Sequence, residues 1–313
     1  MSQARTDFLN RHKTLIGCLS SPIVQDGLPS EIEKNLMAAM FRNGLAVLAF
    51  SMMEAFIRDR TAEILKSFSN ISVRFSDLSE SLQTAVTINA LKAVVFKAGL
   101  REKPDQIAWA LGKLPTITTS STNIASLSEL SFGHTRSNLL PADVTEILGS
   151  FGIEGGWSAI LSIAQRVGLG GVPDYSQAFK DIGKRRHSAA HDATTNIPIN
   201  DLNDSANSII AICCAFDLLI SHSLSIHNTG KVPKKTTGLI KVESIGLRFI
   251  STHPKKAGHF REQVEKSKKL HTIKIHPSIS AAEQACIAAC STNRQQLVQL
   301  GANSTPERWR TWP

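Results

Sequence analysis

The sequence predicts a mainly α-helical bundle that carries a small, basic α+β appendage at its C-terminal end. Three observations support this fold class. Apolar residues recur at helical spacing through most of residues 1–226, no β-type alternation appears before about residue 230, and the charge changes sharply near residue 227. We therefore divide the chain into a helical domain at residues 1–226 and a basic C-terminal module at residues 227–313.

The composition is ordinary for a soluble globular protein, with 42% apolar residues in a chain of 313. No apolar run approaches the roughly 18 residues that cross a bilayer, and the first residues lack the apolar core of a signal peptide. We expect a cytoplasmic protein without membrane association. The five cysteines form no C-x-x-C pair, which favours reduced, packed thiols over disulfides or a zinc site.

The net charge of +9 is unevenly distributed. Residues 1–226 hold 20 Lys and Arg against 21 Asp and Glu, whereas residues 227–313 hold 15 against 5. A segment with such an excess is attracted to polyanions, and nucleic acid is the polyanion we expect in the cytoplasm. The alternative is a basic segment that is simply solvated.

The first two helices are predicted at residues 2–19 and 31–68. Ser30 and Glu33 have the spacing of a capping box at the start of the second helix. Residues 45–57 are apolar almost all round, which predicts a helix at the domain centre.

Glu54 is a carboxylate with apolar neighbours inside this central segment. A charged group in such a position is usually paired or functional. Two interpretations remain open: Glu54 belongs to a functional site, or it is a buried partner of Arg58 one turn later.

The middle of the domain is less regular. Helices are predicted at residues 78–97 and 105–114, and another begins at Pro141. Residues 115–140 are rich in Ser and Thr and predict a long loop, in which His134 is an ordinary loop residue.

Two helices complete the predicted bundle. Asp174 caps a helix that ends near Asp192, and a last strong helix covers residues 201–224. In the C-terminal module, residues 238–250 predict one or two strands, and further elements follow. These are a basic helix at 258–270, a strand at 271–276, a helix at 280–300 and an exposed aromatic and basic tip at 309–313.

The stretch at residues 184–192 holds three cations and two imidazoles. Metal-free RNA cleavage needs a base for the 2′-hydroxyl, an acid for the leaving oxygen and a cation for the phosphorane. Histidine titrates in the right range for the proton transfers, and arginine presents a fork of donors to phosphate oxygens. We therefore interpret Arg186 and His191 as catalytic, with Lys184 and Arg185 as substrate-binding cations.

The spacing of this pair indicates a composite site. Positions 186 and 191 lie about 140° apart around an ideal helix. One helix therefore cannot easily present both side chains to one phosphate. A second copy across a twofold axis would place two Arg–His sets around one groove, which predicts a homodimer.

Two segments resemble a known family. Arg186-His187-x-x-x-His191 resembles the signature of the HEPN superfamily of nucleases, and residues 51–59, which include Glu54, resemble the second-helix segment of its RiboL-PSP-HEPN branch. The order of elements is similar as well, and the resemblance covers about residues 5–226.

This resemblance implies a helical-bundle endoribonuclease that works without a metal or other cofactor, usually as a dimer, and leaves a 2′,3′-cyclic phosphate. It implies that His191 is the acid or base and that Arg186 stabilises the transition state. His187 would assist or orient, and Glu54 would orient or polarise the site. Such proteins are typically toxins or antiphage effectors with an antitoxin or regulatory partner, although some members only bind or scaffold.

Three other interpretations of the stretch stay open. His187 and His191 share a helix face as zinc ligands do, with Asp192 as a third ligand, but the adjacent cations would repel a metal ion. The stretch also fits a non-catalytic patch that grips nucleic acid or a partner. Finally, it fits a solvated basic helix end that complements the helix dipole.

Overall fold

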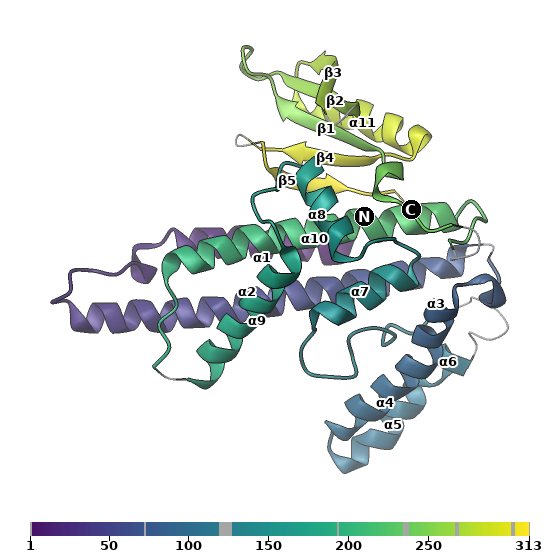
Figure 1. Cartoon of the computed structure of the whole chain (residues 1–313), viewed down its shortest axis with the longest axis horizontal. Helices are drawn as coiled ribbons and strands as arrows, with labels where there is room; N and C mark the ends of the chain where they lie inside the picture. Colours follow the sequence, from purple (N-terminus) through teal and green to yellow (C-terminus); the bar gives the residue numbers. More distant parts are fainter. Residues whose placement is uncertain are drawn as a thin grey trace.

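The computed structural model describes residues 2–71, 73–118, 127–192, 194–233, 238–266, 269–301 and 304–312. It confirms a mainly helical bundle with a small mixed sheet at the C-terminal end (Figure 1). The helices are α1 (Gln3–Leu19), α2 (Ile32–Ser67), α3 (Glu80–Thr84), α4 (Ala90–Gly99), α5 (Lys103–Lys113), α6 (Pro115–Thr118), α7 (Pro141–Ser150), α8 (Trp157–Arg166), α9 (Tyr175–His191), α10 (Ile199–His227) and α11 (Ile279–Asn293). The strands are β1 (Leu247–Thr252), β2 (Phe260–Lys266), β3 (Lys269–His276), β4 (Gln296–Leu300) and β5 (Pro306–Arg310).

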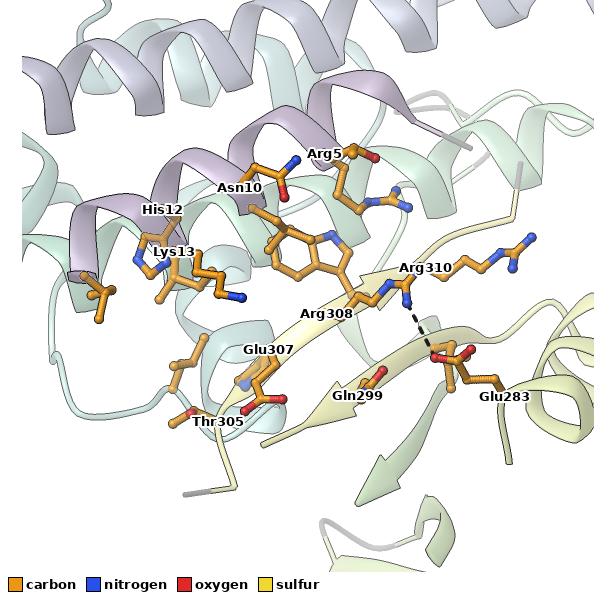
Figure 2. A pocket seen from close by; sticks show the side chains of 18 of the residues that line it. Arg5, Asn10, His12, Lys13, Glu283, Gln299, Thr305, Glu307, Arg308 and Arg310 are labelled. Atoms are coloured by element: carbon orange, nitrogen blue, oxygen red, sulfur yellow. Dashed lines mark ion pairs between the residues drawn. The ribbon is translucent and has the colours of Figure 1, made fainter. Parts of the chain in front are cut away.

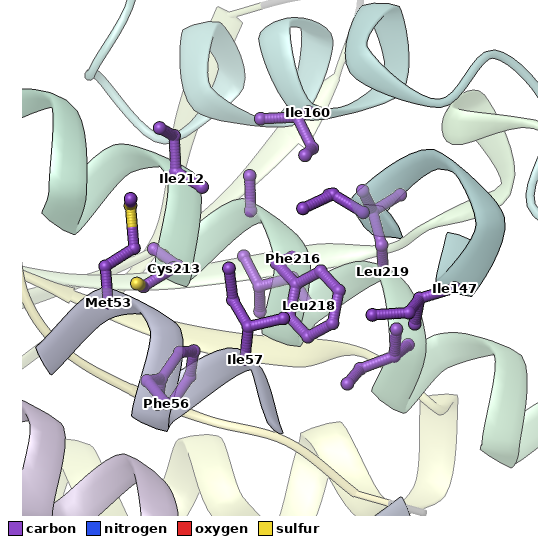
Figure 3. Packing of buried hydrophobic residues seen from close by; sticks show 14 of the residues in the cluster. Met53, Phe56, Ile57, Ile147, Ile160, Ile212, Cys213, Phe216, Leu218 and Leu219 are labelled. Atoms are coloured by element: carbon purple, nitrogen blue, oxygen red, sulfur yellow. The ribbon is translucent and has the colours of Figure 1, made fainter. Parts of the chain in front are cut away.

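The bundle is built on α2 and α10, which lie side by side along the long axis of the molecule (Figure 1). Their apolar faces meet in the core, where α7 and α8 cover them (Figure 3). Full burial of one large apolar side chain contributes about 1.5–3 kcal/mol, so this seam is the main source of stability in the bundle. Residues at its centre are Met53, Phe56, Ile57, Ile147, Ile160, Ile212, Cys213, Phe216 and Leu219.

The sheet has the strand order β3-β2-β1-β4-β5. β1 and β4 are parallel, whereas the other neighbours are antiparallel, and α11 leads from β3 into β4. Both faces of β1 are covered, because Phe249 packs into the core of the bundle and Ile250 packs under α11. The sheet is therefore fixed to the helices through a continuous core.

A buried ionic cluster joins the bundle to the last strand. Asp217 of α10 is fully buried and accepts hydrogen bonds from Arg5 Nε and Arg60 Nε, each at 2.6 Å. It also accepts from Trp309 Nε1 at 2.8 Å and from Ser221 Oγ at 2.9 Å. Burial alone would raise the pKa of the Asp217 carboxyl, but the two arginines hold that pKa well below its usual range.

Most predicted helices of the bundle are present, with local differences. α2 begins at Ile32 without the Ser30 capping box, because the Glu31 carboxylate instead accepts from the Leu28 N–H at 2.6 Å. The segment predicted as one helix at 78–97 is α3, a π-helical turn at Ala85–Asn89 and α4. The amphipathic α8 was not predicted. In the predicted loop at 115–140, Pro115–Thr118 forms α6, and residues 119–126 lie outside the described residues.

The C-terminal module differs more from the prediction. The predicted basic helix at 258–270 is wrong, because residues 260–266 form β2 and residues 269–270 begin β3. Backbone pairing with β1 outweighs the weak intrinsic preference of this charged segment. The predicted helix at 280–300 ends at Asn293, where Arg294 adopts a positive φ of 53° and the chain turns into β4.

The predicted exposed tip at 309–313 is also wrong over its described residues. Trp309 is buried at 2% exposure, because its indole enters the core and donates to Asp217. Arg310 and Trp312 are half-buried beside each other, and Pro313 lies outside the described residues. The end of the chain therefore contributes to the fold.

Two long apolar helices, α2 and α10, concern the prediction that the protein has no membrane-spanning segment. α2 and α10 are long and apolar enough, by length and composition alone, to cross a bilayer, which corrects the expectation that no segment reaches this length. In the most apolar window of α10, 94% of the residues are buried in the protein, against 39% in that of α2. Core helices pass the same test, so the finding is weak support for a membrane span, and the absence of one stays a prediction.

Replacement of Asp217 by Ala is expected to lower the free energy of unfolding by about 3–5 kcal/mol at pH 7, because it leaves Arg5 and Arg60 buried without a counter-charge. Urea denaturation followed by circular dichroism measures this change. Since the folded carboxyl has a depressed pKa, its contribution is complete above the ordinary carboxyl pKa of about 3.9. The difference between wild type and variant should therefore shrink as the pH falls below about 4.

The matched control is Arg74→Ala, which removes an ion pair with Asp77 in which the arginine side chain is 84% exposed. It should cost less than about 1 kcal/mol. An equal loss in both variants would contradict a special role for the buried cluster.

Candidate active site

Helix α9 presents the basic stretch because its other face is anchored. The Asp174 carboxylate caps its first turn by accepting from the N–H groups of Ser176 and Gln177, as the sequence predicted. The buried ring of Phe179 then packs edge-on against Phe50 of α2, with ring centroids 5.7 Å apart. The apolar face of α9 therefore lies against the bundle and leaves the last two turns for the charged residues.

His187 and His191 are both exposed near the end of α9. Their ring centroids lie 4.7 Å apart, as expected for positions one turn apart on one helix face. Two neighbouring imidazoles can share the work of a reaction that needs one proton acceptor and one proton donor. The structure thus brings together two of the predicted catalytic residues on an open surface.

Arg186 has a different environment from the histidines. Its side chain is half-buried and close enough to α2 for its charge to lower the pKa of Glu54. Its Nε is buried and has no hydrogen-bond partner in the described part of the protein. A buried donor without a partner costs about 1–3 kcal/mol, so the arginine retains donor capacity that an incoming phosphate can use.

Glu54 lies in α2 and is buried. Burial is the largest influence on the Glu54 carboxyl and raises its pKa, while the Leu139 N–H and the charges of Arg58 and Arg186 act against it. The carboxylate accepts from the Leu139 N–H and lies 3.6 Å from Arg58 Nη2. The ion pair with Arg58 that the sequence suggested is therefore confirmed, and the charge of Arg186 acts on the same carboxyl.

Arg58 also fixes a loop that sequence reasoning did not connect to the site. It donates to the carbonyl oxygens of Gly133 at 2.9 Å and Ser137 at 3.2 Å. Gly133 has a φ of 69°, and an added Cβ would collide with Leu139. The only sequence signal was a glycine within Ser131–Arg136, since these contacts join residues more than 70 positions apart.

The two predicted substrate-binding cations, Lys184 and Arg185, differ in how far their side chains are free to contact RNA. The Lys184 side chain is 74% exposed, and its Nζ lies 3.6 Å from the Asp181 carboxylate. Arg185 instead turns toward α10, where its Nε is 3.3 Å from the Asp201 carboxylate and its Nη1 donates to Ser205 Oγ at 3.4 Å. Arg185 therefore links α9 to α10, and its contact with RNA stays a prediction.

The turn after α9 is held by side chains of α2. Asn43 Nδ2 donates to the Thr195 carbonyl at 2.7 Å, and the buried Arg42 donates to the Ile197 carbonyl at 2.8 Å. Asp192, considered above as a metal ligand, accepts from the backbone and hydroxyl of Thr194, which lowers its pKa. Within the described ranges, no group of three or more His, Cys, Asp or Glu side chains is arranged to hold a metal ion.

A family model for RiboL-PSP-HEPN matches residues 7–222. The chain belongs to the RiboL-PSP-HEPN family. The match includes most of α1 through most of α10, and therefore every residue described in this site, but none of the sheet. Comparisons with curated proteins and with solved structures give no match. Membership in a family of HEPN-type domains associates this RiboL-PSP-HEPN protein with RNA cleavage or RNA binding in general terms.

The environment of Glu54 in this RiboL-PSP-HEPN domain can be tested through the pH dependence of stability. Because its folded pKa is raised, the protonated carboxyl is favoured by folding, and that contribution is lost as the pH rises through the folded pKa. Glu54→Gln keeps an acceptor for the Leu139 N–H without the buried charge. Relative to wild type, the variant should gain stability as the pH rises from 4.5 toward neutrality, measured as urea midpoints at several pH values. A variant that loses stability relative to wild type over this range would contradict the prediction.

Proposed function

We propose that this protein is a metal-independent endoribonuclease whose centre is formed by Arg186, His187 and His191. The observation that carries the proposal is the exposed pair of imidazoles on α9, inside a domain of the matched family. Arg186, their neighbour in the sequence, has a buried Nε without a partner among the described residues. No metal or other cofactor is required by this chemistry. Lys184, which is exposed on the preceding turn, would attract the phosphate backbone.

The proposed reaction is an internal transfer at one RNA phosphate. An imidazole removes the proton of the 2′-hydroxyl, whose oxygen attacks the adjacent phosphorus, while a second, protonated imidazole gives its proton to the departing 5′-oxygen. The products are a 2′,3′-cyclic phosphate and a 5′-hydroxyl. We assign the principal proton transfer to His191 and the assisting one to His187, with Arg186 donating to the phosphorane oxygens. Glu54 would orient Arg186 through its charge.

The proposed site is composite and needs a second copy of the chain. Arg186 is half-buried and its charge acts on Glu54 of α2, whereas the imidazoles are exposed, in agreement with their separation around the helix. An arginine from a partner copy would complete the groove in front of each histidine pair.

An exposed apolar stripe supports self-association. It lies on the N-terminal half of α2, the half that holds the turn after α9 through Arg42 and Asn43. A contiguous apolar surface of this kind commonly marks an interface. The stripe consists of Ile32, Leu36, Met37, Met40, Phe41 and Leu48, with exposures between 47% and 74%.

The cellular role we propose is that of a cytoplasmic toxin or antiphage effector. Family membership supports this role, and the proposed metal-free chemistry is consistent with it, since an RNase of this type would need only RNA to act. An effector that damages cellular RNA must be restrained, so we include an antitoxin or regulatory partner in the proposal.

A second candidate function is RNA binding without cleavage. The observation that favours it is the basic character of β2, β3 and the loop before them, which Figure 1 places farthest from the bundle. Such a surface would grip phosphates regardless of the histidines. Its exposed basic residues are Lys255, Lys256, Lys266, Lys269, His271 and Lys274.

The principal test is cleavage of total RNA in EDTA by wild type, Arg186→Ala and His191→Ala. Wild type should cleave and leave cyclic-phosphate ends, whereas each variant should lose at least about a hundredfold in rate. Lys66→Ala, at an exposed lysine of α2 outside both proposed RNA-contacting surfaces, is the matched control and should cleave normally. RNA binding by all four proteins without cleavage by any would favour the second candidate.

The composite site is tested by mixing two inactive variants. Arg186→Ala and His191→Ala should together recover part of the activity that each lacks alone, because a mixed dimer contains one complete site. Met40→Glu, which places a charge on the stripe, should halve the mass measured by light scattering and abolish cleavage. Val95→Glu, at a residue of α4 that is 73% exposed, is the matched control. A site contained in one copy would give no recovery on mixing.

A further inference from the structure

A cleft of about 1020 Å³ lies between the helical bundle and the C-terminal sheet (Figure 2). One wall is formed by α1 and α10, and the other by α11, β4, β5 and the residues just before β5. The lining includes none of the residues assigned above to the nuclease centre. Its volume is at the upper end of the range of sites that enclose a small organic ligand.

Apolar side chains from both parts of the molecule line the cleft together with polar ones. Ile16 of α1 and Ile210 of α10 line the bundle side, whereas Ile279 and Ile287 of α11 line the opposite side. Branched aliphatic side chains on two facing walls suit a flat, weakly polar body held between them.

Three side-chain amides in the lining have no hydrogen-bond partner among the described residues. They are Asn10 of α1, Asn207 of α10 and Gln299 of β4. Each amide offers both donors and an acceptor, the combination that pairs with the edge of a nucleobase. A purely aliphatic ligand would leave these groups unused.

The charges of the lining favour an anion. Arg5 is neutralised by Asp217, and Arg308 lies 3.5 Å from Glu283. The other charged side chains of the lining are two cations, Lys13 and Arg310, and one carboxylate, Glu307, so the balance is positive. Lys13 has no ion pair among the described residues, and Figure 2 shows its side chain directed into the space between α1 and β5. Its ammonium is therefore available to a phosphate.

We propose that this cleft binds a free ribonucleoside phosphate, with its base among the amides and isoleucines and its phosphate at Lys13. The site is separate from the nuclease centre, but both touch the start of α10. Asn207 and Ile210 line the cleft, whereas Asp201 and Ser205, which come before them in the same helix, hold Arg185 of α9. Binding is independent of RNA cleavage and can be tested even if the proposed nuclease activity is wrong.

The experiment is isothermal titration calorimetry on the full-length His191→Ala protein with AMP, ATP, GMP and GTP, and with inorganic phosphate as a separate arm. At least one nucleotide should bind saturably. Lys13→Ala and Asn10→Ala, introduced separately at exposed positions of α1, should each weaken binding about tenfold or more. Lys66→Ala, at an exposed lysine of α2, is the matched control and should bind normally.

Three results would overturn the proposal. The first is no binding of any of the four nucleotides at millimolar concentration, and the second is binding that both α1 variants leave unchanged. The third is inorganic phosphate binding as tightly as the nucleotides, which would reduce the site to a simple anion contact. A short RNA oligonucleotide that binds more tightly than every mononucleotide, and loses affinity in Lys13→Ala, would assign the cleft to the RNA strand instead.

Discussion

The buried carboxylate of Asp217 is the constraint on which the arrangement of this protein depends. A fully desolvated charge is tolerated only with strong compensation, and here two arginines, a serine and an indole supply it. These partners come from α1, α2, α10 and β5, so the charge can be satisfied only when the N-terminal helix and the final strand are both in place. Trp309 in the final strand is therefore needed to stabilise a buried charge that lies 92 positions earlier in the chain.

In the candidate active site, in contrast, polar groups are left incompletely paired. Arg186 keeps a buried Nε without a partner among the residues that the structure describes, and burial raises the pKa of the Glu54 carboxyl in spite of two nearby arginines. Neither feature is expected in a region optimised for stability alone. Unmet donors and perturbed carboxyls are commonly concentrated where a ligand or a reaction completes the arrangement. The contrast with the fully satisfied Asp217 cluster supports the proposal that the functional residues lie on α9.

Features of this structure that depend on neighbouring residues in the sequence could be predicted, whereas features that depend on distant residues could not. Helices α2, α9 and α10 follow from apolar periodicity and, for α9, from the Asp174 cap, and the adjacent rings of His187 and His191 follow from helical spacing. The strand β2 was mistaken for a helix because its partner strands, not its own residues, determine its conformation. The Arg58 contacts with the 133–137 loop, the burial of Trp309 and the turn of Arg185 toward α10 likewise depend on tertiary neighbours that local patterns do not reveal.

The firm attachment of the sheet has a consequence for RNA recognition. Phe249, Val298 and Trp309 belong to the same core as the helices, so the basic surface of β2 and β3 is held in a fixed position relative to α9. A hinged basic tail would raise the local concentration of any RNA near the histidines. A fixed surface instead favours RNA whose shape allows it to reach both the sheet and the end of α9. Under the proposed function, selectivity among RNAs would therefore arise from the geometry between these two surfaces more than from base contacts at the cleaved phosphate.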